Sequence, residues 1–240
     1  MCLAGRVHIV EVELSVSNPA EAADYFAQTL GAYLGLDEGR PAVTIGASRL
    51  ILMPGRAGEG VHHLAFDIPI ARFTEHRDWL QQRVPLLTNA AGESEFEGPS
   101  GWNSRSVYFS GPDQMVLELI GRRSRPQPPT GHQPMPQLMS ISEVGVAVAD
   151  VPAAVRELRS RLGVEVLGAA SAEFAPVGDH FGLLILVTYG RGWLPVFDVH
   201  AEPLPLHLTL QNSRASQVEW TPTTLHLNDV AAVATEAGTQ

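Results

Sequence analysis

One segment of this chain occurs twice, and this internal repeat constrains the fold more than any other feature. Residues 11–31 (EVELSVSNPAEAADYFAQTLG) align without a gap with residues 143–163 (EVGVAVADVPAAVRELRSRLG), at a constant offset of 132 positions. The alignment pairs Glu11 with Glu143. A repeated segment of this kind predicts that the chain is built from copies of one supersecondary unit.

Both copies have the pattern of a strand followed by a helix. Alternating apolar and polar residues predict the strand, which ends at a side chain suited to cap a helix, Asn18 or Asp150. Pro19 adds a residue that favours the first helical position. A glycine follows each helix, Gly31 or Gly163, as expected for a left-handed C-terminal residue.

Further copies of the unit fill the rest of the chain. A third strand–helix start lies at residues 63–80, and short apolar runs predict strands at 42–46, 49–53, 106–110 and 115–120. The first half therefore reads β-α-β-β-β twice. The second half opens with the same unit, including an apolar run at 182–192, and then becomes irregular, with predicted strand starts at 204–210 and 223–238.

A proline-rich segment divides the chain. Residues 124–137 carry five prolines and show no apolar periodicity, which is typical of a linker. We therefore predict a first module of two units at 1–122, a linker at 123–139 and a second, degenerate or truncated module at 140–240.

Composition and charge exclude several classes of protein. The net charge is −10, and the best basic cluster, Arg122, Arg123 and Arg125, is too small to bind nucleic acid. Cys2 is the single cysteine, so neither a disulfide framework nor a thiolate zinc site is expected. The N-terminus meets acidic residues too early for a signal peptide, and no apolar run is long enough to span a membrane. We expect a cytoplasmic protein without nucleic-acid or membrane partners.

The predicted strand within residues 61–69 (VHHLAFDIP) opens on two adjacent histidines. Because successive side chains of a strand point to opposite faces, His62 shares a face with Leu64 and Phe66, and it is predicted to lie in the core. His63 shares the other face with Ala65 and Asp67. Because the side chains of this face are small or polar, we predict that it lines a site.

Two glutamates stand in the middle of other predicted strands. Glu11 and Glu118 are surrounded by apolar residues in sequence, and a carboxylate in such a strand is costly unless it is paired or bound to a cation. Together with His63 they lie on three different strands. Two facing copies of the unit would bring such strands together at the floor of a cup.

The stretches VHHLAFDIP (61–69) and SVYFSGPDQMVLELI (106–120) resemble the vicinal oxygen chelate superfamily, which includes glyoxalase I, bleomycin-resistance proteins and extradiol dioxygenases. The resemblance implies an α+β fold in which repeated βαβββ units form two curled, mixed β-sheets with helices packed outside. It also implies a site for one divalent metal inside a curled sheet.

Carried over to this sequence, the resemblance implies that His63 takes the fifth-strand ligand position and Glu118 the eighth-strand position. Glu11 falls where the first-strand ligand, normally histidine, would be, and the fourth-strand position near 50–53 holds only apolar residues. A site with one histidine and two carboxylates favours Mn²⁺ or Fe²⁺, with Mg²⁺ or Zn²⁺ as further candidates. A protein without any metal is the alternative.

Residues of the loops are candidates for contacts with a small-molecule ligand. In the first half these are Trp102, Asn103, Arg105 and Tyr108, and in the second half Arg191 and Trp193. Glu13 or Tyr108 could act as a general base.

The second half repeats part of the proposed ligand set. Glu143 and His207 correspond to Glu11 and His63, but no counterpart of Glu118 follows them. We therefore expect the second cup to lack a metal.

Three functions remain open at this point. The first is a metal-dependent lyase, isomerase or dioxygenase-like enzyme acting on a small oxygenated molecule. The second is a metal-free protein that sequesters a small molecule, as bleomycin-resistance proteins do. A degenerate relative that serves as an interaction module is the third, and the chain could be a monomer or a homodimer.

Overall fold

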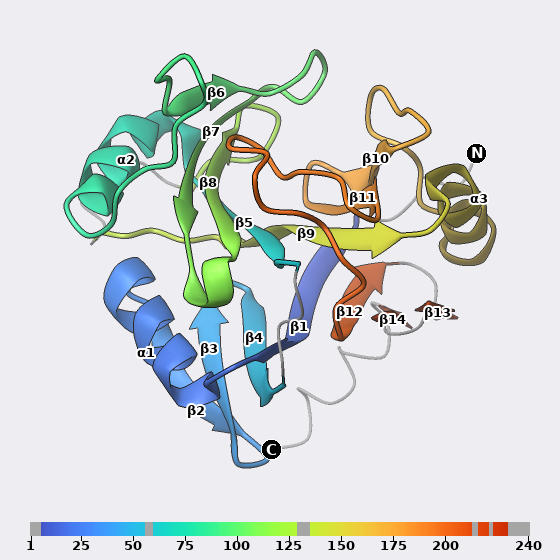
Figure 1. The fold of residues 1–240 in the computed structure, drawn as a ribbon, viewed down its shortest axis with the longest axis horizontal. Coiled ribbons are helices and arrows are strands. Elements are labelled where there is room, and N and C mark those ends of the chain that lie inside the picture. The colour runs from blue at the N-terminus through green and yellow to red at the C-terminus, as the bar shows by residue number, and fades with distance from the viewer. Residues whose placement is uncertain (1–5, 56–59, 129–134, 213–215, 221–222, 230–240) are drawn as a thin grey trace.

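The repeated units build two β-sheets of seven strands each in the computed structural model (Figure 1). The structure describes residues 6–55, 60–128, 135–212, 216–220 and 223–229. Cys2 and the predicted helical end of residues 223–238 lie outside these ranges.

The first two units have the predicted order of elements. The first consists of β1 (His8–Val16), α1 (Pro19–Leu30), β2 (Tyr33–Asp37), β3 (Arg40–Ile45) and β4 (Ser48–Pro54). The second consists of β5 (His63–Ile68), the short 3₁₀ turn η1 (Ile70–Arg72), α2 (Phe73–Gln81), β6 (Glu95–Glu97), β7 (Ser104–Ser110), the 3₁₀ turn η2 (Pro112–Gln114) and β8 (Val116–Arg122).

The part of the chain after the proline-rich segment begins with the same order. It contains β9 (Ser140–Val148), α3 (Val151–Leu162), β10 (Phe174–Asp179) and β11 (Gly182–Thr188). The final unit consists of β12 (Leu206–Asn212), β13 (Ser216–Trp220) and β14 (Thr223–Asp229), so residues 223–229 of the last predicted strand–helix start form a strand.

The local signals at the ends of the repeated helices are confirmed. The side chains of Asn18 and Asp150 each accept a hydrogen bond from the backbone N–H three residues further on, at 3.3 and 2.8 Å. Gly31 and Gly163 end the two helices with φ angles of 63° and 67°, which a residue with a side chain rarely adopts.

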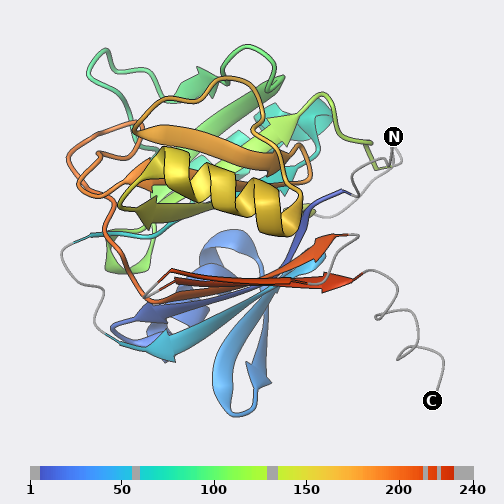
Figure 2. The same ribbon diagram turned by 90° about the vertical axis from the view of Figure 1, so that its right-hand side faces the viewer.

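Each sheet combines units from both sides of the proline-rich segment. One sheet, here called sheet A, has the strand order β13-β14-β12-β1-β4-β3-β2, and the other, sheet B, has the order β10-β11-β9-β5-β8-β7-β6. The segment at 123–139 thus separates the units along the chain, whereas the first unit shares sheet A with the last, and the second shares sheet B with the third. Figure 2 shows the two sheets as separate layers.

A single large apolar cluster joins the two sheets. It contains side chains from the central strands of both, such as Val12, Leu50, Phe66 and Leu208, together with residues of α1, α2 and α3. Phe26 of α1 meets Phe66 of β5 edge to face, with 6.2 Å between ring centroids. The predicted α+β fold of two curled, mixed sheets is confirmed. The apolar side of each sheet faces this cluster, so the opposite side is free to carry polar groups.

Ser48 links the two sheets through its hydroxyl group. This buried side chain donates a hydrogen bond to the carbonyl of Ile9 at 2.7 Å and accepts one from the backbone N–H of Ile141 at 2.9 Å. Ile9 belongs to sheet A and Ile141 to sheet B. One hydroxyl therefore satisfies a buried donor and a buried acceptor from different layers.

We expect Ser48→Ala to lower the free energy of unfolding by about 1–3 kcal/mol, because it leaves both backbone groups without a partner. Chemical denaturation measures this loss. Ser160→Ala, on the exposed side of α3, is the control and should change stability by less than about 0.5 kcal/mol. Equal effects of the two substitutions would show that the hydroxyl of Ser48 does not tie the sheets together.

A buried ion pair lies at the end of β5. Asp67 is 1% exposed, and its carboxylate lies 3.0 Å from Nε of Arg125. Burial raises the pKa of Asp67 to about 6, although Arg125 and Arg122 act in the opposite direction. The protonated form is thus favoured in the folded state compared with the unfolded chain.

This shift predicts a specific dependence of stability on pH. Between pH 4 and 6 the folded protein binds more protons at Asp67 than the unfolded chain does, so the free energy of unfolding should fall as the pH rises through this window. The change from this one residue is about 3 kcal/mol at most. Denaturation of Asp67→Asn at several pH values should show a smaller fall. Asp24→Asn, at an exposed position of α1, should keep the wild-type slope, and an unchanged slope in Asp67→Asn would contradict the assignment.

Candidate metal centre and ligand pocket

Three neighbouring strands of sheet B place one carboxylate on each side of a small residue. Ala65 of β5 is the register partner of Glu118 in β8 and also of Glu143 in β9. Tyr108 of β7 continues this row beyond Glu118, and Leu183 of β11 continues it beyond Glu143. Because paired residues of adjacent strands share a face, the side chains of Glu118 and Glu143 stand on the same side of the sheet as that of Ala65.

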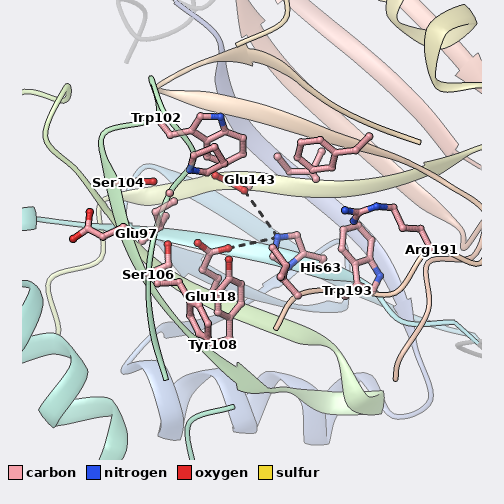
Figure 3. Close-up of a pocket in the computed structure, with 17 residues that line it drawn as sticks. His63, Glu97, Trp102, Ser104, Ser106, Tyr108, Glu118, Glu143, Arg191 and Trp193 are labelled. Atoms are coloured by element: carbon pink, nitrogen blue, oxygen red, sulfur yellow. Dashed lines mark ion pairs between the residues drawn. The ribbon is translucent and has the colours of Figure 1, made fainter. Parts of the chain in front are cut away.

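His63 completes the cluster from two residues earlier in β5. Its Nε2 atom lies 3.7 Å from Oε2 of Glu118 and 4.0 Å from Oε2 of Glu143. One potential ligand atom from each of the three residues lies within 4.8 Å of the others, and all three side chains are buried (Figure 3). The prediction that His63 faces a site is therefore supported by the geometry.

A backbone contact fixes the protonation of the His63 ring. Nδ1 lies 3.0 Å from the carbonyl oxygen of Val116, which can only accept a hydrogen bond, so Nδ1 carries a proton. In the neutral ring the lone pair of Nε2 then points toward the two carboxylates. This arrangement requires a second proton on the ring, a proton on one of the facing carboxylates or a cation between the three side chains.

The electrostatics of the cluster reflect the same requirement. Burial raises the pKa of Glu118 to about 7, and the negative charge of Glu143 adds to this effect. Burial lowers the pKa of His63, but Glu143 and Glu118 outweigh it and raise the pKa above its ordinary value. Without a cation, the site therefore holds protons that a solvent-exposed histidine and glutamate would release near pH 7.

Arg122 is a member of this site that the sequence did not reveal. Its side chain is fully buried, its Nη2 binds Oε1 of Glu143, and its Nη1 donates to the hydroxyl of Ser142 at 3.0 Å. In the sequence it belongs to a basic cluster beside the proline-rich segment. Its spacing could have indicated its place in the site, since Glu118, Ile120 and Arg122 are two residues apart and therefore share one face of β8.

The residues present fit one divalent cation. Arg122 occupies Oε1 of Glu143 and leaves Oε2 on the side of His63. One imidazole nitrogen and two carboxylate oxygens form a donor set suited to Mn²⁺ or Fe²⁺. The neighbouring side chains of Leu183 and Ile185 in β11 are apolar and offer no ligand atom. A cation held by three protein ligands would therefore have coordination positions open toward the pocket.

The cluster forms the floor of a pocket of about 370 Å³ (Figure 3). Most of its wall is aromatic or aliphatic, and the larger side chains are Phe96, Trp102, Tyr108, Ile120, Phe174, Ile185, Trp193 and Leu194. The hydroxyls of Ser104 and Ser106, the carboxylate of Glu97 and the guanidinium of Arg191 add polar groups. Such a site admits a small organic molecule.

Tyr108, a predicted ligand contact, lines the pocket beside Glu118. Its hydroxyl interacts with Glu118, and burial, together with the charges of Glu118 and Glu143, raises its pKa well above the usual value. The phenol therefore stays protonated and is a hydrogen-bond donor to the carboxylate. This protonation disfavours Tyr108 as a general base.

Trp193 and His63 lie in direct contact. Their rings stack with 5.0 Å between centroids and 29° between planes. Gly145 of β9 makes this possible, because a Cβ atom there would lie 2.5 Å from the Trp193 ring and 2.9 Å from Cβ of His63. His62 points the other way and is buried, as predicted, and this burial lowers its pKa to about 4.

Two of the predicted ligand contacts lie elsewhere. The side chain of Asn103 is exposed and donates to the hydroxyl of Ser124 at 3.3 Å. Arg105 binds Glu95, and its guanidinium lies 4.5 Å from the centroid of the Phe73 ring. Neither residue lines the pocket, because alternation along β7 turns Arg105 to the face opposite Ser104 and Ser106.

The expectation that Glu11 joins His63 and Glu118 is corrected by the structure. Glu11 lies in β1 of sheet A, where its carboxylate is 3.3 Å from Arg49, while Glu13 is 2.6 Å from Arg40. Glu143, the counterpart of Glu11 in the repeat, stands in its place. Pairing of β5 with β9, across the proline-rich segment, is the cause.

Sheet A carries the other half of the repeated pair. His207 of β12 is the register partner of Glu13, and Thr209 is that of Glu11. Within the ranges that the structure describes, the group around His63 is the one cluster of three potential metal ligands. In the same ranges, no helix has the length and apolar character needed to cross a membrane.

Comparison with solved structures connects this architecture with known proteins. No protein-family model matches the sequence, and no curated protein matches it significantly. Glyoxalase I from Zea mays superimposes with a TM-score of 0.57 at 13% identity, over 96% of this chain and 95% of that one. A putative dioxygenase from Bacillus subtilis superimposes with a TM-score of 0.54 at 15% identity, over 87% of this chain and 71% of that one. The chain therefore shares the fold of these two proteins, which is the fold that its sequence motifs predicted.

Proposed function

We propose that this protein is a metal-dependent enzyme that acts on a small oxygenated molecule, with His63, Glu118 and Glu143 as the metal ligands. The observation that carries the proposal is the convergence of one imidazole nitrogen and two carboxylates, all buried, at the floor of a pocket. A divalent cation bound there would polarise neighbouring oxygens of the substrate as a Lewis acid. Mn²⁺ and Fe²⁺ suit this donor set best.

The surrounding residues would orient the ligands and control their charge. The carbonyl of Val116 fixes the His63 ring, and the hydroxyls of Ser106 and Tyr108 contact Glu118. Arg122 holds Glu143 from behind. The aromatic wall would keep water away from the substrate, so that charges at the floor act in a medium of low polarity.

The fold neighbours support this proposal at the level of class. Glyoxalase I and a dioxygenase share the architecture. Because one fold hosts many reactions, the likeness supports a lyase, an isomerase or a dioxygenase-like enzyme equally.

A second candidate function is metal-free binding of a small molecule. The observation that favours it is the ion pair between Arg122 and Glu143, which already neutralises one of the two carboxylates. Protonation of His63 or Glu118 could balance the other. The apolar pocket would then hold an organic ligand without a cation.

Metal binding distinguishes the two functions. After chelator treatment and dialysis, we expect the protein to take up about one Mn²⁺ per chain, measured by elemental analysis and titration. Glu118→Gln and Glu143→Gln should each weaken binding by at least about tenfold, because each removes one ligand. Glu11→Gln, which changes a carboxylate of sheet A, should bind Mn²⁺ like the wild type.

Uptake below about 0.1 Mn²⁺ per chain would end the enzyme proposal and leave metal-free binding. Weaker binding by Glu11→Gln than by Glu143→Gln would restore Glu11 as the ligand. Circular dichroism of each variant shows whether it is folded.

Arg122 gives an independent prediction. Arg122→Met leaves Glu143 buried without its partner, so we expect the metal-free variant to lose about 3–5 kcal/mol of stability. A cation would replace the missing positive charge, and Mn²⁺ should therefore raise the melting temperature of Arg122→Met more than that of the wild type.

Arg123→Met is the matched control, because Arg123 is the next residue and its half-exposed side chain binds Glu97 on the surface. Its response to Mn²⁺ should equal that of the wild type. An equal response of Arg122→Met would argue against a cation beside Glu143. Thermal unfolding with either Mn²⁺ or EDTA provides the measurement.

A further inference from the structure

We infer that the pocket selects a flat aromatic ligand that carries a carboxylate, and that Arg191 binds this carboxylate. The inference deepens the proposed function, on which it rests for the reaction, although the recognition itself does not require a metal. It joins three observations: an aromatic wall, a basic side chain at the pocket without an acidic partner, and a buried hydroxyl without a partner.

Five aromatic side chains, those of Phe96, Trp102, Tyr108, Phe174 and Trp193, line the pocket. Trp102 and Trp193 are buried, whereas Phe96 and Phe174 are only partly buried and leave ring surface uncovered. Phe96 meets Tyr108 edge to face, with 5.5 Å between centroids. Rigid, flat surfaces of this kind favour a flat ring over a puckered one, because ring faces can stack on them.

Arg191 is the basic residue of the pocket lining. Its guanidinium lies 5.1 Å from the centroid of the Phe174 ring, and its Nη1 donates a long hydrogen bond of 3.5 Å to the carbonyl of Gly192. Burial lowers the pKa of Arg191, and the charge of Glu173 acts in the opposite direction, but among the described residues no carboxylate forms an ion pair with Arg191. By contrast, Arg40, Arg49, Arg77 and Arg105 each form an ion pair with a carboxylate.

The backbone holds Arg191 in this position. Residues 189–201 form a hairpin-like loop in which the N–H of Ala201 donates to the carbonyl of Arg191 at 2.9 Å, and the N–H of Trp193 donates to that of Val199 at 2.9 Å. Because Arg191 and Trp193 are two residues apart in an extended segment, both face the pocket. Since Trp193 is stacked on His63, the loop fixes Arg191 relative to the floor.

The guanidinium of Arg191 is partly buried, so it has lost hydration, and no ion pair offsets this cost. A carboxylate of the ligand would offset it through two parallel hydrogen bonds. On the other side of the pocket in Figure 3, the buried hydroxyl of Ser104 has no hydrogen-bond partner among the described residues. It offers a donor or acceptor to a polar group at the far end of the same ligand.

The test uses three matched probes on the full-length, EDTA-treated protein: 2-naphthoate, its neutral amide 2-naphthamide and the saturated decahydro-2-naphthoate. Isothermal titration calorimetry gives the dissociation constants. We expect 2-naphthoate to bind at least about tenfold more tightly than either of the others, because only it combines charge with a flat ring.

Variants assign the preference for charge. Arg191→Gln should abolish the difference between 2-naphthoate and 2-naphthamide and leave the dissociation constant of the amide within about twofold of the wild type. Arg156→Gln, at an exposed position of α3, should keep the wild-type preference. Circular dichroism and an unchanged affinity for the amide confirm that Arg191→Gln is folded.

Four results would overturn the inference: no binding of 2-naphthoate at millimolar concentration, equal affinity of the wild type for acid and amide, equal affinity for 2-naphthoate and decahydro-2-naphthoate, or an undiminished charge preference in Arg191→Gln. Each can be separated from failure of the proposed function. Absence of Mn²⁺ binding with an intact charge preference would remove the enzyme proposal alone. Mn²⁺ binding without a charge preference would remove only this inference.

Discussion

The candidate site depends on the antiparallel pairing of β5 with β9. This pairing puts Ala65 opposite Glu143, while the parallel pairing of β5 with β8 puts the same alanine opposite Glu118. The methyl group of Ala65 leaves the space between the two carboxylates open. A shift of one residue in either register would turn one carboxylate to the apolar side of the sheet, where no partner awaits it. The register therefore decides both the fold of sheet B and its chemistry.

The negative charge of the two glutamates in this site is balanced by Arg122 and by protons, and this balance determines whether the site has room for a cation. Arg122 neutralises Glu143 from behind, and the raised pKa values of His63 and Glu118 show that the front of the cluster retains protons in the absence of a cation. A bound metal would displace these protons. On the proposed function, the site would change between a protonated and a metal-bound form, and this would link the two candidate functions to one set of residues.

Local signals made much of the fold predictable. The caps at Asn18 and Asp150, the terminal glycines and the alternation of His62 and His63 all depend on residues close in sequence. The partner of each unit was not predictable in this way, because strand pairing is a long-range choice between similar edges. Glu11 and Glu143 occupy equivalent places in the repeat, and the sequence alone could not decide which of them stands beside His63. Arg122 was missed because its neighbours in sequence resemble a linker, although its place in β8 makes it part of the core.

Anomalous diffraction from crystals grown with Mn²⁺ would show whether His63, Glu118 and Glu143 surround one cation. We expect one strong anomalous peak between Nε2 of His63 and the facing oxygens of both carboxylates, at about 2.0–2.3 Å from each. Absence of this peak at saturating Mn²⁺, or a peak beside Glu11 and Glu13 instead, would mean that these three side chains do not share a cation.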